Sequence, residues 1–255
     1  MSRLHTFLLE TTPEQGVPEL ITSDREHALK VLRLKAGTRI LGVDGRGKCW
    51  ELEVKAAGRR QLELAHTGPA RVEPPPGSAG ASLPWLEVCT PLPKGNRAES
   101  LFSQLTQLGL ARLVPLVTEH SEAQARELPD SRKERMIRAG QEAIKQCGSL
   151  WLPEIAHPET LASLLKKPAC RVVLDPLAES SFSSVLAGVD SPSEFTPESP
   201  FQLILGPEGG LSASEIELMV QNGSIRACIS PHVLRIENAA LAGLGIAAEA
   251  WMKIP

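Results

Sequence analysis

The 255-residue sequence predicts an α/β protein in which a domain with a mainly parallel sheet follows a small β-rich domain. Three observations support this. Short apolar runs alternate with helical patterns after residue 83, as in parallel sheets. Residues 1–72 contain segments in which polar and apolar residues alternate, as in half-exposed strands. The segment VEPPPGSAGAS at 72–82 has the composition of a linker. We therefore predict domains over 1–72 and 83–255.

The first domain is predicted to be a small barrel. Residues 39–43 lead into Asp44-Gly45, a pair typical of hairpin turns. Residues 50–54 and 61–64 alternate as strands do.

One short helix is predicted over 24–32, capped by Ser23 or Asp24, with Lys30 and Arg33 near its end. Residues 1–72 carry 12 basic and 9 acidic residues, a net charge of +3, whereas the whole chain has −3. This asymmetry suits an RNA-binding module, although a solvated surface gives the same pattern.

In the second domain, five short apolar segments and five helical patterns alternate. The predicted strands are 85–90, 113–117, 171–174, 201–205 and 225–229. The predicted helices are 98–108, one starting at Asp130, 158–166, one starting after Ser212 with Glu215 completing a capping box, and 239–252 capped by Asn238. In the helix after Ser212, the residues Ile216, Met219 and Val220 are predicted to face inward.

Glycine-rich loops follow these strands. The strand over 201–205 stops at GPEGG, residues 206–210, which neither a strand nor a helix continues through. Ligands of parallel α/β sheets bind outside the carboxyl ends of strands, where glycines let the backbone approach closely. We therefore expect a cofactor site built from the loops after Leu174, Leu205 and Ile229. The last helix is rich in alanine and glycine, which suggests close approach of another backbone.

Several familiar sites are absent from the sequence. It has no G-x-G-x-x-G after a strand, no P-loop and no G-x-S-x-G elbow. The six histidines lack the spacing of metal ligands, so we expect no metal, and the five cysteines are expected to be free thiols. With no apolar run of transmembrane length, we expect no membrane association and a cytoplasmic protein.

Five segments together resemble one enzyme family. The two most specific are LILGPEGGLSASEIELM (203–219) and VLRIENAALAG (233–243), and the others are HALKVLRLKAG (27–37), PKGNRAESLFSQLTQLGL (93–110) and QEAIKQCGSLWLPEI (141–155). In this order they resemble the RsmE-type ribosomal RNA (uracil-N3)-methyltransferases of the SPOUT (trefoil-knot) class.

The resemblance implies a C-terminal SPOUT trefoil-knot domain and an N-terminal PUA-like RNA-binding barrel. It implies S-adenosyl-L-methionine as cofactor, a homodimer, and N3 of one uridine in small-subunit (16S) rRNA, or in the assembled small subunit, as target. The cofactor would be held by Leu174, Leu205, Gly206, Pro207, Glu208, Gly209, Gly210, Ile229, Leu234, Asn238 and Ala240.

The target poses a chemical problem, because the uracil N3 proton must leave for the methyl group to be accepted. Arg235 is a candidate for stabilising the uracil anion or positioning the RNA, and Glu237 for acting as the base or for orienting groups by hydrogen bonds. The alternatives are that Arg235 binds phosphate and that Glu237 is an acid favoured at a helix start. Lys94 and Arg97, together with Lys30 and Arg33, are expected to contact the RNA backbone.

The sequence departs from the family pattern at Ile236, Asn238, His120 and Ser149, which leaves activity and substrate open. A non-catalytic RNA-binding or ribosome-assembly protein with the same fold is the alternative. A third possibility, methylation of the ribose 2′-oxygen, usually comes with an S-L-N-type motif where this sequence has VLRIENAA.

Overall fold

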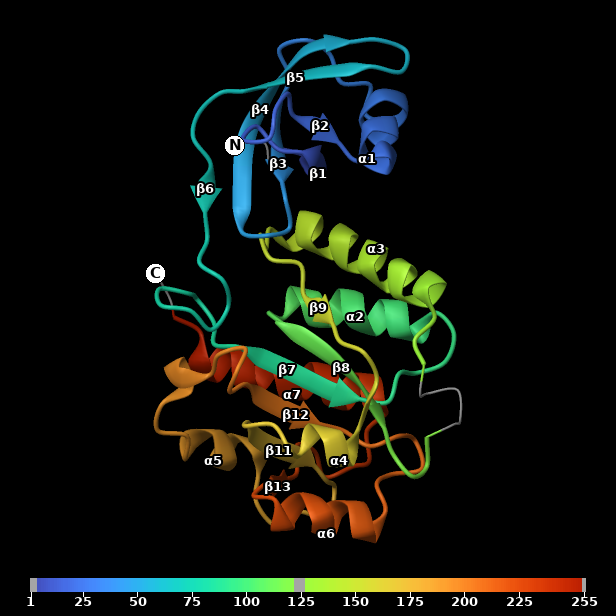
Figure 1. The fold of residues 1–255 in the computed structure, drawn as a ribbon, viewed down its shortest axis with the longest axis vertical. Coiled ribbons are helices and arrows are strands. Elements are labelled where there is room, and N and C mark those ends of the chain that lie inside the picture. The colour runs from blue at the N-terminus through green and yellow to red at the C-terminus, as the bar shows by residue number, and fades with distance from the viewer. Residues whose placement is uncertain (1–3, 122–126, 254–255) are drawn as a thin grey trace. The chain divides into compact units, whose positions relative to one another are not determined.

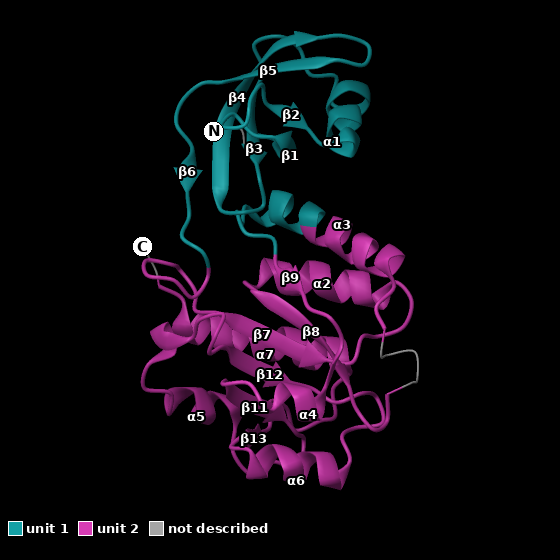
Figure 2. Ribbon diagram, in the orientation of Figure 1, with its two compact units in different colours: residues 1–75, 141–152 teal, residues 76–140, 153–255 magenta. Residues whose placement is uncertain are grey.

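The computed structural model describes residues 4–121 and 127–253 and divides into two compact units. Unit 1 comprises residues 1–75 and 141–152, and unit 2 comprises residues 76–140 and 153–255 (Figure 2). The helix α3 (Asp130–Cys147) therefore begins in unit 2 and ends in unit 1. The predicted domains 1–72 and 83–255 include residues 1–3, 122–126 and 254–255, which lie outside the described residues.

Unit 1 is built on a curved, mostly antiparallel sheet. Its strands are β1 (Thr6–Thr11), β2 (Glu19–Leu20), β3 (Arg39–Val43), β4 (Lys48–Ala57), β5 (Leu62–His66) and β6 (Arg71–Val72). The strand order is β2-β1-β3-β4-β5, with β6 paired to β4. The two end strands, β2 and β5, contact each other, so the sheet nearly closes and the predicted barrel is confirmed.

The predicted hairpin joins β3 to β4. The two strands pair antiparallel from Arg39↔Glu53 to Val43↔Cys49. Asp44 Oδ1 accepts hydrogen bonds from the backbone N–H groups of Arg46 and Lys48, at 2.7 and 3.0 Å. Gly45 has φ +69°, a conformation that favours glycine.

The hydrophobic core of unit 1 has two clusters. The larger one consists of Phe7, Leu9, Leu20, Ala28, Ile40, Trp50, Leu52, Val54 and Leu64. The second joins Leu8, Val43 and Cys49 to Ile144 and Leu150. Residues 141–152 thus belong to unit 1 because their apolar side chains complete its core.

The predicted helix of unit 1 is two shorter elements, α1 (Thr22–Glu26) and a π-helix (His27–Val31). The N-cap position is Ile21 and has no side-chain cap, so both predicted capping residues were wrong. Asp24 is 3% exposed and faces inward. It accepts hydrogen bonds from Leu8 N at 2.7 Å and from Lys145 Nζ at 2.6 Å, because burial of a carboxylate requires such partners.

Unit 2 contains a sheet whose strands pair in parallel throughout. They are β7 (Leu86–Thr90), β8 (Arg112–Val117), β9 (Glu154–Ile155), β10 (Glu159–Thr160), β11 (Cys170–Leu174), β12 (Phe201–Ile204) and β13 (Ile225–Ala227). The order is β10-β8-β7-β12-β11-β13, with β9 also paired to β8. Figure 1 shows β7, β12 and β11 side by side in this order. The predicted α/β class with a mainly parallel sheet is confirmed.

Helices cover both faces of this sheet. Besides α3 they are α2 (Arg97–Gln107), α4 (Leu161–Leu164), α5 (Phe182–Ala187), α6 (Ala213–Gln221) and α7 (Ile236–Trp251). Successive residues of a strand point to opposite faces. In β7, Val88 packs in the cluster with α2, α5 and α7, whereas Cys89 packs in the cluster with α4 and α6.

The predicted start of α6 is confirmed. Ser212 Oγ accepts from Glu215 N at 3.2 Å and Ser212 N donates to Glu215 Oε2 at 2.9 Å, which is a capping box. Met219 is buried and Ile216 packs against the same cluster. Val220 was wrongly predicted to face inward, since it is 48% exposed.

Two C-terminal boundaries differ from prediction. The strand β13 ends at Ala227 because Cys228 turns away to hydrogen-bond with Ser180 and Phe182. The helix α7 starts at Ile236 and has no side-chain cap, so the Asn238 cap was wrong. Asn238 is the third helical residue instead.

One glycine of α7 has a packing role. A Cβ at Gly243 would lie 2.5 Å from Leu203 Cδ2, so a larger residue here would displace the Leu203 side chain or move the helix away from β12.

Candidate active site

Three loops of unit 2 meet at the carboxyl ends of β7, β8 and β12. They enclose a pocket of about 750 Å³. Its lining includes Leu92, Pro93, Lys94, Gly95, Arg97, Leu116, His120, Ser121, Leu128, Arg132, Pro207, Glu208 and Gly209. The pocket therefore combines cationic groups with apolar walls at the edge where parallel sheets bind ligands.

The glycine-rich turn 206–210 forms one wall. Leu205 N donates to Cys89 O at 2.9 Å, and Gly210 N donates to Pro207 O at 2.8 Å. A Cβ at Gly206 would lie 2.9 Å from Leu211 N, so the turn itself requires this glycine. At Gly210, with φ +74°, a Cβ would meet no described atom within 4 Å. This part of the turn presents bare backbone, as recognition of a ligand by backbone groups requires.

Arg97 brings two loops together at this end of the sheet. Its Nη1 lies 3.2 Å from Glu237 Oε1, and its Nη2 lies 3.4 Å from Glu208 Oε1. Arg97 stands at the start of α2, Glu208 in the turn after β12, and Glu237 in the first turn of α7. Arg97, predicted to bind RNA, thus forms ion pairs both with Glu208, predicted to hold the cofactor, and with Glu237, predicted to be catalytic.

The loop after β8 is attached to the same turn. His120 Nδ1 lies 3.0 Å from Gly210 O, and Glu119 N donates to Glu215 Oε1 at 2.8 Å. From the sequence, His120 stands out only as a departure from the family pattern. Its position three residues after β8, at the carboxyl end of a parallel strand, was the signal for a role in the site.

The loops after β11 and β13 lie side by side. Asp175 N donates to Ala227 O at 3.0 Å, and Phe182 N donates to Cys228 O at 2.8 Å. Asp175, which is 7% exposed, also accepts from Arg226 Nε at 2.8 Å. These contacts hold the predicted cofactor residues Leu174 and Ile229 on neighbouring segments.

The predicted cofactor residues differ in exposure. Leu205 and Ala240 are buried, Leu174, Ile229 and Leu234 are half-buried, and Glu208, Gly209 and Asn238 are exposed. The described lining of the 750 Å³ pocket includes Pro207, Glu208 and Gly209 of this set, but not the residues of the loops after β11 and β13. Arg235 is exposed at the N-cap of α7.

The predicted RNA-binding residues of unit 1 lie on unusual backbone. Lys30 is in the π-helix and pairs with Glu26 at 2.8 Å. Arg33 has φ +52°, which is uncommon for a residue other than glycine. A π-helix and a positive φ within one short segment are features found at functional sites.

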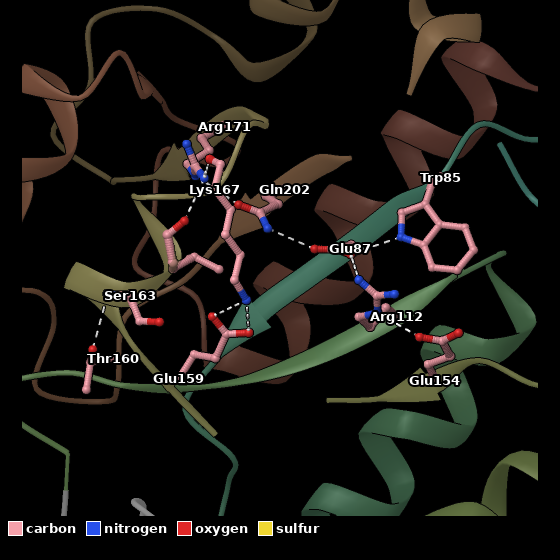
Figure 3. Close-up of polar contacts among 11 residues, drawn as sticks. Trp85, Glu87, Arg112, Glu154, Glu159, Thr160, Ser163, Lys167, Arg171 and Gln202 are labelled. Atoms are coloured by element: carbon pink, nitrogen blue, oxygen red, sulfur yellow. Dashed lines mark hydrogen bonds and ion pairs between the residues drawn. The ribbon is translucent and has the colours of Figure 1, made fainter. Parts of the chain in front are cut away.

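A buried polar network crosses the amino-terminal half of the unit 2 sheet (Figure 3). Glu87, which is 2% exposed, accepts from Trp85 Nε1, Arg112 Nη1 and Gln202 Nε2 at 2.9, 2.9 and 2.8 Å. Gln202 Oε1 in turn accepts from Arg171 Nε at 2.9 Å. Each of these polar groups has a partner, so the network is structural.

Among residues 4–121 and 127–253, no group of three or more His, Cys, Asp or Glu side chains is placed to hold a metal ion. None of the described helices has the length and apolar character needed to cross a bilayer.

Comparisons with known proteins agree with this fold. Residues 81–248 match the RNA methyltransferase domain family, and residues 22–65 match the RNA methyltransferase PUA domain family. The chain belongs to the RNA methyltransferase domain family, which confirms the resemblance found in the sequence.

Its relatives include proteins named ribosomal RNA small subunit methyltransferase E. The one from Synechocystis sp. is 29% identical over 241 residues, covering 91% of this chain and 74% of the relative. The one from Bacillus subtilis is 22% identical over 258 residues, covering 94% of each chain.

Solved structures share the fold over nearly the whole chain. A putative methyltransferase from Legionella pneumophila, in complex with the bound cofactor SAM, has a TM-score of 0.79 at 22% identity and covers 99% of this chain and 100% of its own. Ribosomal RNA small subunit methyltransferase E from Neisseria gonorrhoeae, bound to S-adenosyl methionine, has 0.78 at 19% identity, with 98% of each chain covered.

Proposed function

We propose that the protein transfers a methyl group from S-adenosyl-L-methionine to N3 of a specific uridine in small-subunit (16S) rRNA. One observation carries this proposal. The glycine-rich turn 206–210 presents bare backbone. The His120 ring contacts Gly210 O from the loop after β8, and Arg97 of α2 pairs with Glu208 of the turn and with Glu237 of α7. Family membership and the names of the relatives agree with this function.

The cofactor would lie against the loops after β11, β12 and β13. A Cβ at Gly210 would meet no atom of the described residues within 4 Å, and Leu174, Ile229 and Leu234 are partly buried. These features suit an adenosine held by backbone groups and apolar contacts. Its sulfonium supplies an activated methyl group, so the residues mainly align the two reactants. Arg235, exposed at the start of α7, would stabilise the uracil anion, and Glu237 would orient groups around it.

The RNA would contact basic residues of both units. Lys30 and Arg33 in unit 1, and Lys94 and Arg97 in unit 2, are exposed. Phosphate contacts of this kind fix position on the RNA and carry no sequence information. We assign RNA binding to the domain 1–72 and catalysis to the domain 83–255.

A trefoil knot, a homodimer and a cytoplasmic location also form part of this proposal. The helix α7 follows β13 at the edge of the sheet, yet it packs against α2, β7 and β12. A chain that returns in this way across its own sheet supports the knot. The small residues of α7 suit a helix that packs closely on a second subunit. The cytoplasm is where small ribosomal subunits are found.

Methyl transfer to small ribosomal subunits tests the function. Subunits from a strain that lacks the gene are incubated with the protein and labelled S-adenosyl-L-methionine, and their nucleosides are identified by mass spectrometry. We expect N3-methyluridine at one site. RNA binding without methyl transfer would support a non-catalytic assembly protein, and a 2′-O-methyl product would refute the N3 assignment.

The variant Gly209→Val tests whether the turn 206–210 holds the cofactor. A Cβ at this position would lie 3.6 Å from His120 Cβ, which is ordinary van der Waals contact, so the variant should fold. The added side chain would lie beside His120, next to the pocket that both residues line, and we expect calorimetry to show weakened cofactor binding.

A further inference from the structure

His120 occupies a position from which it can act on a substrate in the pocket. It follows β8, lines the 750 Å³ pocket and contacts the turn 206–210 through its ring. Its Nδ1 lies 3.0 Å from the carbonyl oxygen of Gly210. In the proposed function, this side chain only holds the turn 206–210 to the loop after β8.

The partner of Nδ1 determines which ring nitrogen carries the proton. A carbonyl oxygen can only accept a hydrogen bond, so Nδ1 must be the donor to Gly210. In a neutral imidazole with its proton on Nδ1, Nε2 keeps a free lone pair and is a proton acceptor. The contact with Gly210 therefore sets His120 as a base at Nε2.

Neighbouring contacts hold the imidazole in place. The backbone before it is fixed by Glu119 N, which donates to Glu215 Oε1 at 2.8 Å, and Glu215 belongs to the capping box of α6. The turn 118–121, which contains His120, is closed by Thr118 N, which donates to Ser121 Oγ at 2.9 Å. A base that is held on both sides by hydrogen bonds is pre-organised for proton transfer.

The charged groups of the pocket and of the segments next to His120 are three cations and four carboxylates. They are Lys94 and Arg97 from the loop after β7 and the start of α2, Arg132 from α3, Glu127 before α3, Glu208 from the turn after β12, Glu215 from α6, and Glu119 beside it. The cations stabilise a developing negative charge on a substrate. The pocket has a volume of about 750 Å³, which is in the range of small-molecule sites and is enough for one nucleotide.

The geometry points to His120 as the general base that takes the N3 proton of the target uridine, an inference that rests on the proposed function. His120 Nε2 accepts the N3 proton while the N3 electron pair attacks the methyl carbon. The N–CH₃ bond forms and the C–S bond breaks, with its electron pair going to sulfur. The products are N3-methyluridine and S-adenosylhomocysteine, and the imidazolium then releases its proton to water. The uracil N–H is about as weakly acidic as a tyrosine hydroxyl, so a base accelerates this step.

Two substitutions separate the base from the tether. In His120→Asn, the side-chain N–H₂ takes the place of Nδ1–H and keeps the hydrogen bond to Gly210 O, but the basic Nε2 is gone. In His120→Gln, the amide reaches toward the position of Nε2 and the Nδ1 donor is lost. We expect both to lower kcat by about 10²- to 10⁴-fold, the range for loss of a general base. For His120→Asn, we expect the KM and the calorimetric Kd for S-adenosyl-L-methionine to change less than threefold.

The pH profile adds a readout that a tether would not affect. The wild-type and His120→Asn rates should depend differently on pH, because asparagine has no group that accepts the N3 proton. The His120→Asn rate should continue to rise until the uracil itself ionises. A normal kcat for His120→Asn together with a low kcat for His120→Gln would show a tether only, and would overturn the proposal.

The protonated nitrogen can be observed without any reaction. In ¹⁵N-histidine-labelled protein, NMR should show one neutral imidazole protonated at Nδ1 whose signal is missing in His120→Asn. A His120 ring protonated at Nε2 would refute the inference. If the wild-type protein itself transfers no methyl group to the small subunit, the proposed function fails as well. If it does, while the variants match it in rate and pH profile, only the role of His120 fails.

Discussion

Replacing Glu87 with glutamine should destabilise unit 2 even though the side chain keeps its shape. Glu87 Oε1 accepts from Trp85 and Arg112, and Oε2 accepts from Gln202. A glutamine amide presents an N–H₂ group at one of these two positions, where it meets another donor. Gln202 cannot rotate to relieve this, because its own oxygen accepts from Arg171 Nε at 2.9 Å.

The magnitude follows from two losses. A buried donor left without an acceptor costs about 1–3 kcal/mol, and replacing a charge-assisted hydrogen bond to Arg112 by a neutral one costs about 1 kcal/mol. Glu87 is 2% exposed, so water offers little compensation. We therefore expect a loss of about 3 kcal/mol in the free energy of unfolding. For a chain of this size, that is a decrease in Tm of roughly 6–12 °C.

The double variant Glu87→Gln/Gln202→Glu is the matched control. A carboxylate at 202 accepts from both Arg171 and the new amide at 87, so the direction of the hydrogen bonds is restored. We expect it to regain at least half of the lost stability. Gln202→Glu alone should destabilise, because it places two carboxylates together in a buried site.

Urea unfolding followed by tryptophan fluorescence and circular dichroism measures these differences, and Trp85 lies within the network as a reporter. The reasoning would be refuted if Glu87→Gln were within 0.5 kcal/mol of wild type, the limit of ordinary surface effects. A double variant no more stable than Glu87→Gln would equally refute it.

Three further predictions concern other sites. Arg97→Met keeps the apolar stem of the side chain but removes its ion pairs with Glu208 and Glu237, which together are worth about 0.5–2 kcal/mol. Calorimetry should therefore show 2- to 30-fold weaker binding of S-adenosyl-L-methionine. Unchanged affinity would exclude a role of Arg97 in positioning the turn 206–210. Lys145→Met leaves the buried Asp24 carboxylate without its cation and should lower the free energy of unfolding in urea by about 3 kcal/mol. Adding Asp24→Asn to this variant should recover part of the lost stability. No recovery would contradict the pairing of Asp24 with Lys145. Burial raises the pKa of the Cys89 thiol well above its usual range, so this thiol stays protonated and unreactive at pH 8. The exposed Cys147 should react first with a disulfide reagent. A fast phase of the reaction that persists in Cys147→Ser would show that this order of reactivity is wrong.

Local sequence signals predicted the features that depend on neighbouring residues. The capping box of α6, the hairpin turn at Asp44-Gly45 and the strand β3 all followed from residues within a few positions of each other. The small barrel and the parallel sheet followed from periodicity, because the period of apolar residues separates strands from helices.

Features that depend on distant residues could not be predicted. Arg97 and Glu237 are 140 residues apart, and Glu87 and Gln202 are 115 apart. No spacing in the sequence relates such pairs, and only the order of the strands brings them together. Asp24 was predicted as a helix cap because acidic residues favour that position, but it is buried against the barrel by Leu8 and Lys145. Its role depended on a segment more than 100 residues away.

The return of the chain to unit 1 at residues 141–152 has a consequence for dissecting the protein. No single cut yields both units intact. A fragment ending at residue 75 lacks Ile144 and Leu150, so Leu8, Val43 and Cys49 would lose their apolar partners and face water. Such a fragment should aggregate, whereas a chimera carrying residues 141–152 on a short tether should remain in solution.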